Sequence, residues 1–207
     1  MALEKTGQSF KTMAITINGN GTLTGVSVGG LPDGIVDTDM IAAKAATAPK
    51  LGNGSILQVV HSFKKDAFSD SSGGYAAITG LSVTIAAAST SNKLLFVCNL
   101  TYSISAQTIF HARLYDGTSE ITASRSTISS TANQNAWITD YNKSNVSAGD
   151  IITNTIASYL HTPADTNSHT YNIYARSAGG NSIYINRREY DTDFGGTSSF
   201  YVYEVAA

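Results

Sequence analysis

Residues 93–105, KLLFVCNLTYSIS, show the clearest periodicity in the chain. Every second residue from Leu94 to Ile104 is apolar or aromatic, and the residues between them are apolar at Leu95 and Val97 and polar afterwards. Side chains of a β-strand alternate between its two faces, whereas a helix would spread them around its circumference. The pattern therefore predicts a central strand with one face buried throughout and the other buried only at its start.

Similar stretches follow one another from Gly52-Asn53-Gly54 to the end of the chain, separated by turn residues. We expect the segments 108–115 and 120–124 to form a hairpin at Asp116-Gly117, and 170–177 and 182–187 to form another. Short strands with regular turn signals indicate an all-β fold, an antiparallel jelly-roll-like β-sandwich. The expected strands are 55–65, 75–86, 93–105, 108–115, 120–124, 135–141, 151–160, 170–177, 182–187 and 198–205.

The first 54 residues differ from the rest because they contain few large apolar side chains. One short helix is expected at about 38–46, and its apolar residues Met40 and Ile41 need a partner surface, since so short a helix is marginal alone. We therefore predict an extended N-terminal anchoring arm or short stalk over residues 1–54, followed by a β-sandwich head over residues 55–207.

The bulk composition excludes several classes of protein. The chain has 207 residues and a net charge of −2, whereas nucleic-acid binding usually needs a basic patch. It has no apolar run of 18 residues, which argues against membrane insertion, and its start lacks a signal peptide, so we expect synthesis in a cytoplasm. Its single cysteine, Cys98, rules out an intrachain disulfide framework.

No catalytic pattern stands out, and we predict no enzyme, no cofactor and no metal site. The four histidines lack zinc spacing, and we expect His111, within a strand, to be packed or hydrogen-bonded. The loop carboxylates Asp191 and Asp193 are weak calcium candidates, although an ordinary aspartate-rich turn is the favoured interpretation. A glycan-cleaving enzyme would need paired carboxylates, and only Glu189 lies close to those two in sequence.

Aromatic residues suggest two kinds of surface. Tyrosines near asparagine and serine suit sugar binding, because they give contact area at low entropic cost. The weak receptor-binding candidates are Tyr141, Tyr159 and Tyr190. The strand 198–205, like 93–105, has two apolar faces, and a symmetry mate is the usual cover for a second face. We expect the protomer core to hold Leu94, Phe96, Leu100 and Tyr102, and the subunit interface to hold Leu95, Val97, Tyr201 and Tyr203.

Several motifs recur in the same order in one group of proteins. They are LGNGSILQV (51–59), TGLSVTIAAASTSNKLL (79–95), RLYDG (113–117), YIN (184–186) and SSFYVYEVA (198–206). Together they resemble the C-terminal domain of fibre-like structural proteins of tailed bacteriophages, and residues 29–51 are similar to tail-fibre segments. The resemblance implies a virion component, a trimer with an anchoring N-terminal arm and a jelly-roll or C1q/tumour-necrosis-factor-like head. It carries over no catalytic or binding residue.

Two functions follow as expectations. The first is a trimeric virion fibre or spike, attached to other virion proteins through residues 1–54 and adsorbing to host-surface glycan through its head. The alternative is a capsid decoration, head-fibre or tail adaptor protein that never contacts a receptor. The sequence does not distinguish a location on the tail, head or baseplate.

Overall fold

The computed structural model describes residues 16–17, 23–24, 51–129, 131, 134–141 and 151–207. It divides the chain into two units, residues 1–47 and 48–207. In the first unit, β1 (Thr16–Ile17) and β2 (Leu23–Thr24) pair antiparallel. The predicted helix at 38–46, with Met40 and Ile41, lies outside the described residues.

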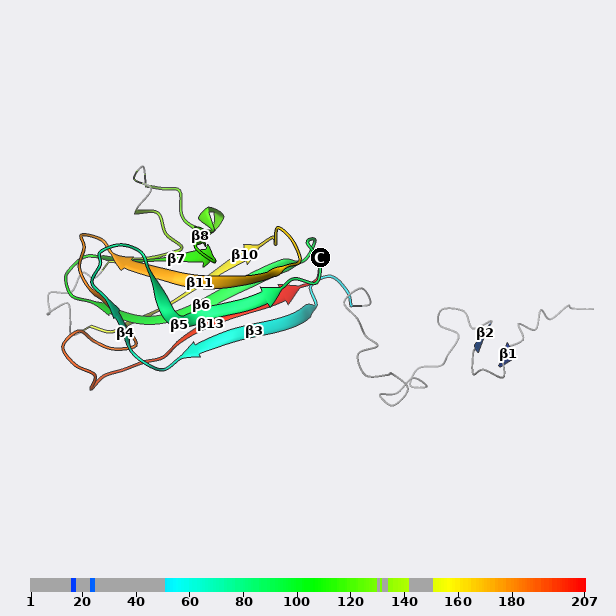
Figure 1. The fold of residues 1–207 in the computed structure, drawn as a ribbon, viewed down its shortest axis with the longest axis horizontal. Coiled ribbons are helices and arrows are strands. Elements are labelled where there is room, and N and C mark those ends of the chain that lie inside the picture. Colours follow the sequence, from blue (N-terminus) through cyan, green and yellow to red (C-terminus); the bar gives the residue numbers. More distant parts are fainter. Residues whose placement is uncertain (1–15, 18–22, 25–50, 130, 132–133, 142–150) are drawn as a thin grey trace, which may run out of the picture. The chain divides into compact units, whose positions relative to one another are not determined.

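The second unit is built almost entirely of strands (Figure 1). The 3-10 turn η2 (Thr122–Ser124) follows β8, and Gln134 also has 3-10 geometry. No described helix is long and apolar enough to cross a membrane. The strands are β3 (Ile56–Lys64), β4 (Phe68–Asp70), β5 (Ala76–Ala86), β6 (Lys93–Ile104), β7 (Ile109–Asp116), β8 (Ser119–Glu120), β9 (Ile138–Tyr141), β10 (Thr153–His161), β11 (Ser168–Ser177), β12 (Ile183–Ile185) and β13 (Ser198–Val205).

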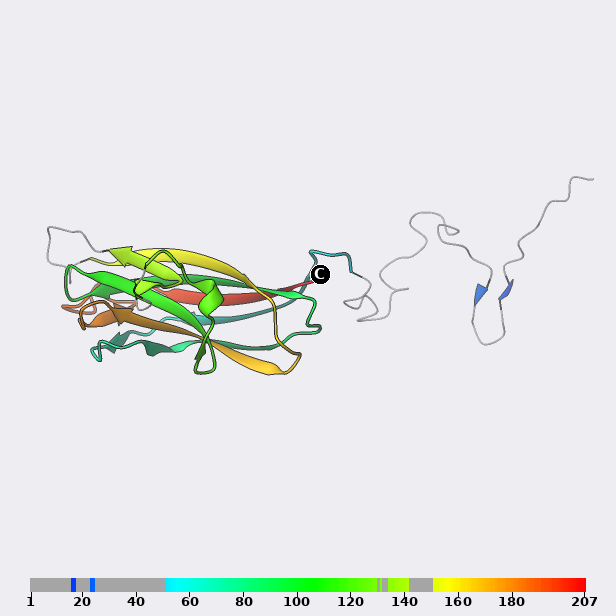
Figure 2. The ribbon, with the colours of Figure 1, turned by 90° about the horizontal axis from the view of Figure 1, so that it is seen from above.

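These strands form two antiparallel sheets. The β6 sheet has the order β3-β13-β6-β12-β4, with β10 on the other side of β6. The β7 sheet has the order β5-β11-β7-β8, with β9 also paired to β7. Neighbouring strands are mostly distant in sequence, and the long strands of both layers run in roughly the same direction (Figures 1 and 2). This arrangement is a jelly-roll-like β-sandwich, as the sequence predicts.

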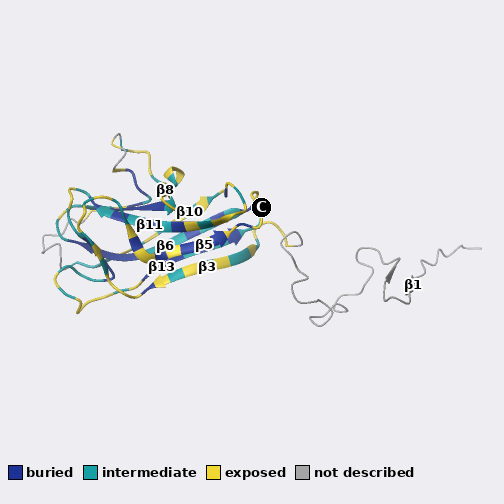
Figure 3. Cartoon of the chain, viewed as in Figure 1, coloured by how far each residue is buried: buried dark blue, intermediate teal, exposed yellow. Residues whose placement is uncertain are grey.

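The core lies between the inner faces of the two sheets (Figure 3). Phe96 of β6 meets Tyr171 of β11 at 4.8 Å between ring centroids, and Tyr102 stacks on Phe110 of β7 at 3.7 Å. Each such side chain contributes roughly 1.5–3 kcal/mol on burial. The alternate residues of β6, from Leu94 to Ile104, are all buried, which confirms the predicted core face.

The other face of β6 differs from the prediction. Leu95 and Val97, at its start, are only half-buried within one chain, whereas the polar residues Thr101 and Ser103 near its end are buried. The connection between β12 and β13 covers this polar end: Thr101 Oγ1 donates to the Thr197 carbonyl at 2.9 Å and Ser103 Oγ to the Arg187 carbonyl at 3.1 Å. The connection between β12 and β13 therefore buries the hydroxyl groups of Thr101 and Ser103, and its carbonyl groups accept hydrogen bonds from them.

Four details of the predicted strands were wrong. Segments 170–177 and 182–187 do not pair as a hairpin, because β11 belongs to the β7 sheet and β12 to the β6 sheet. The strand expected at 120–124 is β8 followed by η2. The β7–β8 hairpin does form, but Asp116 pairs with Ser119 and its turn lies one residue later than expected. The short strand β4 was not anticipated.

Candidate functional site

An apolar surface covers the outer face of the β6 sheet. In register across β10, β6, β13 and β3, three rows of side chains point away from the core. No row contains an acidic residue, a lysine or an arginine. The rows are Leu160, Leu95, Tyr203 and Val59; Ser158, Val97, Tyr201 and His61; and Ile156, Asn99, Ser199 and Phe63. We call this surface the outer β6 face.

The aromatic residues of this face stack on one another. Tyr201 lies 5.4 Å from His61 and 6.1 Å from Tyr203, centroid to centroid, with the rings nearly parallel in both pairs. Large apolar side chains around them remain exposed, including Ile156 at 67% and Phe63 at 50%. An exposed apolar patch that spans several strands is typical of an interaction site.

The outer face of the β7 sheet is polar and ionic instead. Arg113, only 5% exposed, donates from Nε and Nη2 to the Asn135 carbonyl at 3.0 and 2.7 Å and pairs with Glu120 at 3.0 Å. Its guanidinium lies 4.1 Å from the Tyr75 ring centroid, and that of Arg176 lies 4.9 Å from it. These contacts fix residues of the segment between β8 and β9 against β7.

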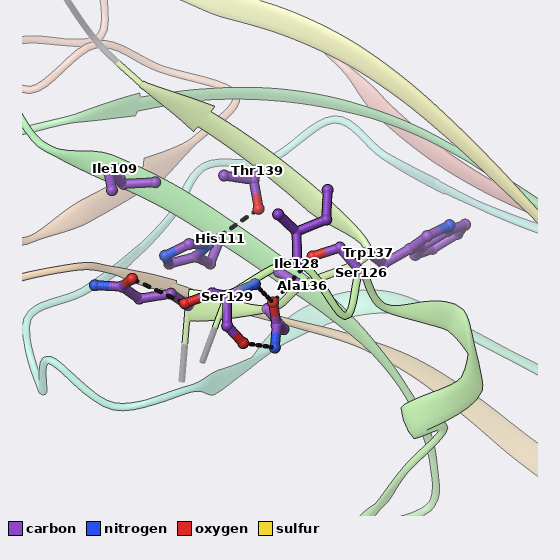
Figure 4. Close-up of a pocket in the computed structure, with 10 residues that line it drawn as sticks. Ile109, His111, Ser126, Ile128, Ser129, Ala136, Trp137 and Thr139 are labelled. Atoms are coloured by element: carbon purple, nitrogen blue, oxygen red, sulfur yellow. Dashed lines mark hydrogen bonds between the residues drawn. The ribbon is translucent and has the colours of Figure 1, made fainter. Parts of the chain in front are cut away.

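A pocket opens beside this ionic cluster, between β7, β9 and the segment that precedes β9 (Figure 4). Its volume is about 480 Å³. None of its lining residues is acidic, lysine or arginine. The apolar lining residues are Ile109, Ile128, Ala136 and Trp137, and the polar ones are His111, Ser126, Ser129, Gln134, Asn135 and Thr139.

Hydrogen bonds hold the polar side of the pocket. Asn135 Oδ1 accepts from Ser126 Oγ at 3.2 Å and from the Ser129 backbone N–H at 3.0 Å, while Asn135 Nδ2 donates to the Ser129 carbonyl at 2.9 Å. Gln134 Oε1 accepts from Ser129 Oγ at 3.2 Å. Because both side-chain amides bond Ser129, this part of the lining is held in place without a charged residue.

His111 forms part of the pocket wall, between Ile109, Thr139 and Ser129 (Figure 4). It is fully buried, as expected, and its Nδ1 lies 3.2 Å from Thr139 Oγ1. Its Nε2 is buried and has no hydrogen-bond partner among the described residues. Burial, together with the nearby Arg176 and Arg113 guanidinium groups, lowers the pKa of His111 to about 4, so the imidazole is neutral at neutral pH.

The three tyrosines proposed for receptor contact lie on different elements. Tyr141, half-exposed, ends β9, and Tyr190, 59% exposed, lies in the connection between β12 and β13. Tyr159 of β10 instead packs against the core, because it is in register with Phe96 on the inner face. The structure therefore does not bring the three together. Sequence reasoning missed the pocket, since its lining segment has no strand periodicity.

Of the two carboxylates proposed for calcium, that of Asp191 forms hydrogen bonds within the loop. Asp191 accepts from Arg188 Nε at 2.7 Å and also from Arg188 Nη2, and its Oδ1 accepts the Asp193 backbone N–H at 3.0 Å. The Arg188 guanidinium lowers the pKa of Asp191. Within the described part of the chain, no three His, Cys, Asp or Glu side chains are grouped to hold a metal.

Two other reactive side chains, Cys98 and Glu204, are buried within the sandwich. Cys98 lies on the core face of β6, where burial raises the pKa of its thiol to about 12 and makes the thiolate scarce at neutral pH. Glu204 is buried and accepts from the Ala88 backbone N–H at 2.7 Å, Asn92 Nδ2 at 2.6 Å and Gln58 Nε2 at 2.5 Å. Both groups are buried within the sandwich, and neither lines the pocket beside β7.

Comparison with known proteins adds little. No protein-family model matches the chain, and no curated protein matches it. Similar solved structures include the VP2 subviral particle of infectious bursal disease virus, at 14% identity and a TM-score of 0.34, covering 72% of this chain and 37% of that one. A structure of the Gt strain of the same virus is 16% identical, with a TM-score of 0.34, 72% coverage of this chain and 38% of that one. At this level of similarity neither likeness bears on function.

Proposed function

We propose that this chain is a non-enzymatic structural protein of a virus particle. It is a trimeric fibre or spike, attached to the particle by residues 1–54, whose β head adsorbs to host-surface glycan. The observation that carries the proposal is the outer β6 face, an uncharged apolar surface on an otherwise complete sandwich. The resemblance of motifs such as 79–95 and 198–206 to phage fibre proteins supports the viral assignment.

The occupant of the outer β6 face is a second copy of the chain. The face is four strands wide and three rows deep. Strands lie about 4.8 Å apart, and residues on one side of a strand follow one another at about 6.8 Å, so the flat area is roughly 400 Å² before side-chain relief is counted. A stable interface buries about 800 Å² per partner, which is of the same order. Leu95, Val97, Tyr201 and Tyr203 would form its centre.

The mass of the purified protein in solution tests the trimer. Ile156→Asp places a charge on the outer β6 face, and Ser82→Asp places the same charge on an exposed position of β5 in the other sheet. At micromolar concentration we expect wild type and Ser82→Asp to be trimers and Ile156→Asp to be a folded monomer. A monomeric wild type, or a trimeric Ile156→Asp, would contradict the proposed interface.

Particle assays test the remaining parts of the proposal. Particles assembled with a chain that lacks residues 1–50 should not incorporate the head, because the anchoring segment is missing. Purified full-length protein should block adsorption of intact particles to host cells. Normal adsorption by particles that lack the chain would favour a decoration or adaptor protein without receptor contact.

A further inference from the structure

One histidine, His61 of β3, lies on the outer β6 face. It is exposed in the single chain, and its ring stacks on that of Tyr201 of β13 with centroids 5.4 Å and planes 16° apart. On its own strand, Val59 and Phe63 flank it on the same side, since alternate residues of a strand share a face. The exposed positions of β3 are yellow in Figure 3. The apolar surface therefore contains one group that can gain a charge near neutral pH.

The elements around His61 offer no carboxylate that faces it. Beyond Phe63 comes Lys65, a cation whose Nζ lies 5.5 Å from the Phe63 ring centroid, and Asp66 is paired with Lys64 at 2.9 Å. The carboxylate of β13 is that of Glu204, which is buried on the core face and accepts hydrogen bonds there. The strand β5, which contacts β3 on its inner side, contains no charged residue and no histidine. A protonated His61 thus meets no opposite charge on this surface.

The same imidazole has different surroundings in a single head and in an assembly. In the single head His61 is exposed, so water solvates the imidazolium, and an exposed histidine gains its proton between about pH 7 and pH 5. Against a second copy the ring would lose this water. The three rows of the outer β6 face contain no acidic residue, so a copy that contacts His61 through these rows supplies no counter-charge. Burial of an unpaired charge is costly.

We propose that the contact between heads is sensitive to acid, with His61 as the group that senses pH. Heads associate while this imidazole is neutral, and its protonation in the separated head opposes association. Assembly is therefore complete at neutral and alkaline pH and weakens as pH falls. A histidine that must be neutral in the contact weakens association about tenfold per head between pH 7.5 and pH 5.5. The inference rests on the proposed function, because it concerns regulation of the same contact.

Analytical ultracentrifugation of the full-length protein at pH 7.5 and pH 5.5, at one ionic strength, tests the proposal. Circular dichroism at both pH values checks that the head stays folded. We expect the wild-type trimer to weaken by about tenfold for each of its heads at pH 5.5. His61→Phe keeps an aromatic ring beside Tyr201 but cannot be protonated, so it should form equally stable trimers at both pH values. His61→Gln, a second neutral variant, should be equally insensitive to pH.

A histidine substitution in the other sheet is the matched control. His169→Gln removes a histidine of β11 that lies against Asp116 and Asp165, so this variant should keep the acid-dependent association of the wild type. Equal wild-type association at both pH values would overturn the proposal and leave the trimer intact. Acid dissociation of both His61 variants would overturn it too, as would neutral variants that are monomers at pH 7.5. A monomeric wild type at pH 7.5 would refute the trimer and this proposal together.

Discussion

The two sheets have similar inner faces and very different outer faces. Inside, both contribute large apolar side chains to one core, such as Phe96 and Tyr171. Outside, the β7 sheet carries Arg113, Tyr75 and Glu120 in a connected cluster, with a hydroxyl pair at Thr84 and Thr170 2.8 Å apart. The β6 sheet carries exposed isoleucine, leucine, phenylalanine and tyrosine instead. The inner faces determine the sandwich, and the outer faces distinguish its two sides.

The two outer faces differ in whether another segment of the same chain covers them. On the β7 sheet, the segment between β8 and β9 accepts hydrogen bonds from the Arg113 guanidinium through the Asn135 carbonyl and also lines the pocket. On the outer β6 face, no described segment of the chain covers the central apolar rows. The first face is therefore suited to recognition of a polar ligand and the second to association with another copy of the head.

Arg113→Leu should have the largest effect on the outer β7 surface. Leucine cannot bond the Asn135 carbonyl or pair with Glu120, and removal of one partner from a buried ionic cluster leaves the other groups uncompensated. We expect unfolding free energy to fall by about 3–5 kcal/mol. Urea denaturation at a concentration that keeps the oligomeric state constant measures this change.

Arg125→Leu is the matched control, because Arg125 pairs with the same Glu120 carboxylate at 3.2 Å but is more exposed. A pair that solvent partly reaches, like this one, contributes only about 0–1 kcal/mol. Equal losses for the two variants would mean that Arg113 does not hold the segment before β9. The assumption of a preformed pocket would then fail.

Acid pH should weaken the same side of the molecule through His111. Its pKa is about 4 in the folded protein, below the ordinary value near 6.5, so between these pH values the unfolded chain binds a proton that the folded chain does not. Stability therefore rises with pH across this window and is lost as pH falls through it. The full contribution is at most about 3 kcal/mol, and urea denaturation between pH 7 and pH 4 measures it.

His111→Gln should lose this acid-dependent contribution, since glutamine does not titrate. His169 does not interfere, because its hydrogen bonds to the Asp165 and Asp116 carboxylates raise its pKa. Its contribution to stability is complete below its ordinary pKa and is lost only as pH rises above it. Parallel pH profiles for wild type and His111→Gln would show that the histidine does not titrate as described.

The core could be predicted from the sequence because it depends on local alternation. Apolar side chains occupy every second position from Leu94 to Ile104. A strand with one core face shows this period whichever strands it pairs with. The pairing of β11 and β12 could not be predicted, since Gly179-Gly180 indicates a reversal but not the sheet that the chain joins afterwards. The burial of Thr101 was missed for a similar reason: it depends on a loop almost one hundred residues away in sequence.

The pocket could not be predicted for a related reason. Ser126, Ser129 and Asn135 have the composition of an ordinary loop, and tertiary contacts such as those of Arg113 with the Asn135 carbonyl and of the Trp137 N–H with the Ala112 carbonyl hold their segment on β7. Tyr159 shows the converse, because a tyrosine in a strand carries no local sign of which sheet face it occupies. Side-chain identity alone did not separate its inner position from the outer position of Tyr201.

Two matched tyrosine substitutions, one on each outer face, should have the smallest effect on folding stability. Tyr201 stacks on Tyr203 and His61 on the outer β6 face, and Tyr174 stacks on Tyr115 on the other sheet with centroids 4.0 Å apart. An aromatic pair contributes about 0.5–1.5 kcal/mol beyond its buried area. Under dilute conditions we expect Tyr201→Ala and Tyr174→Ala each to lower unfolding free energy by about 1 kcal/mol.

Association should separate the two variants. If Tyr201 lies at the centre of the contact between heads, its truncation costs about 2 kcal/mol per interface, which weakens association about thirtyfold. Tyr174→Ala should leave association unchanged, because its face is not the one that meets another copy. Analytical ultracentrifugation across a concentration series measures both. Equal association of the two variants would show that the apolar face is not the contact between heads. The two outer faces would then differ in surface chemistry but not in their role in assembly.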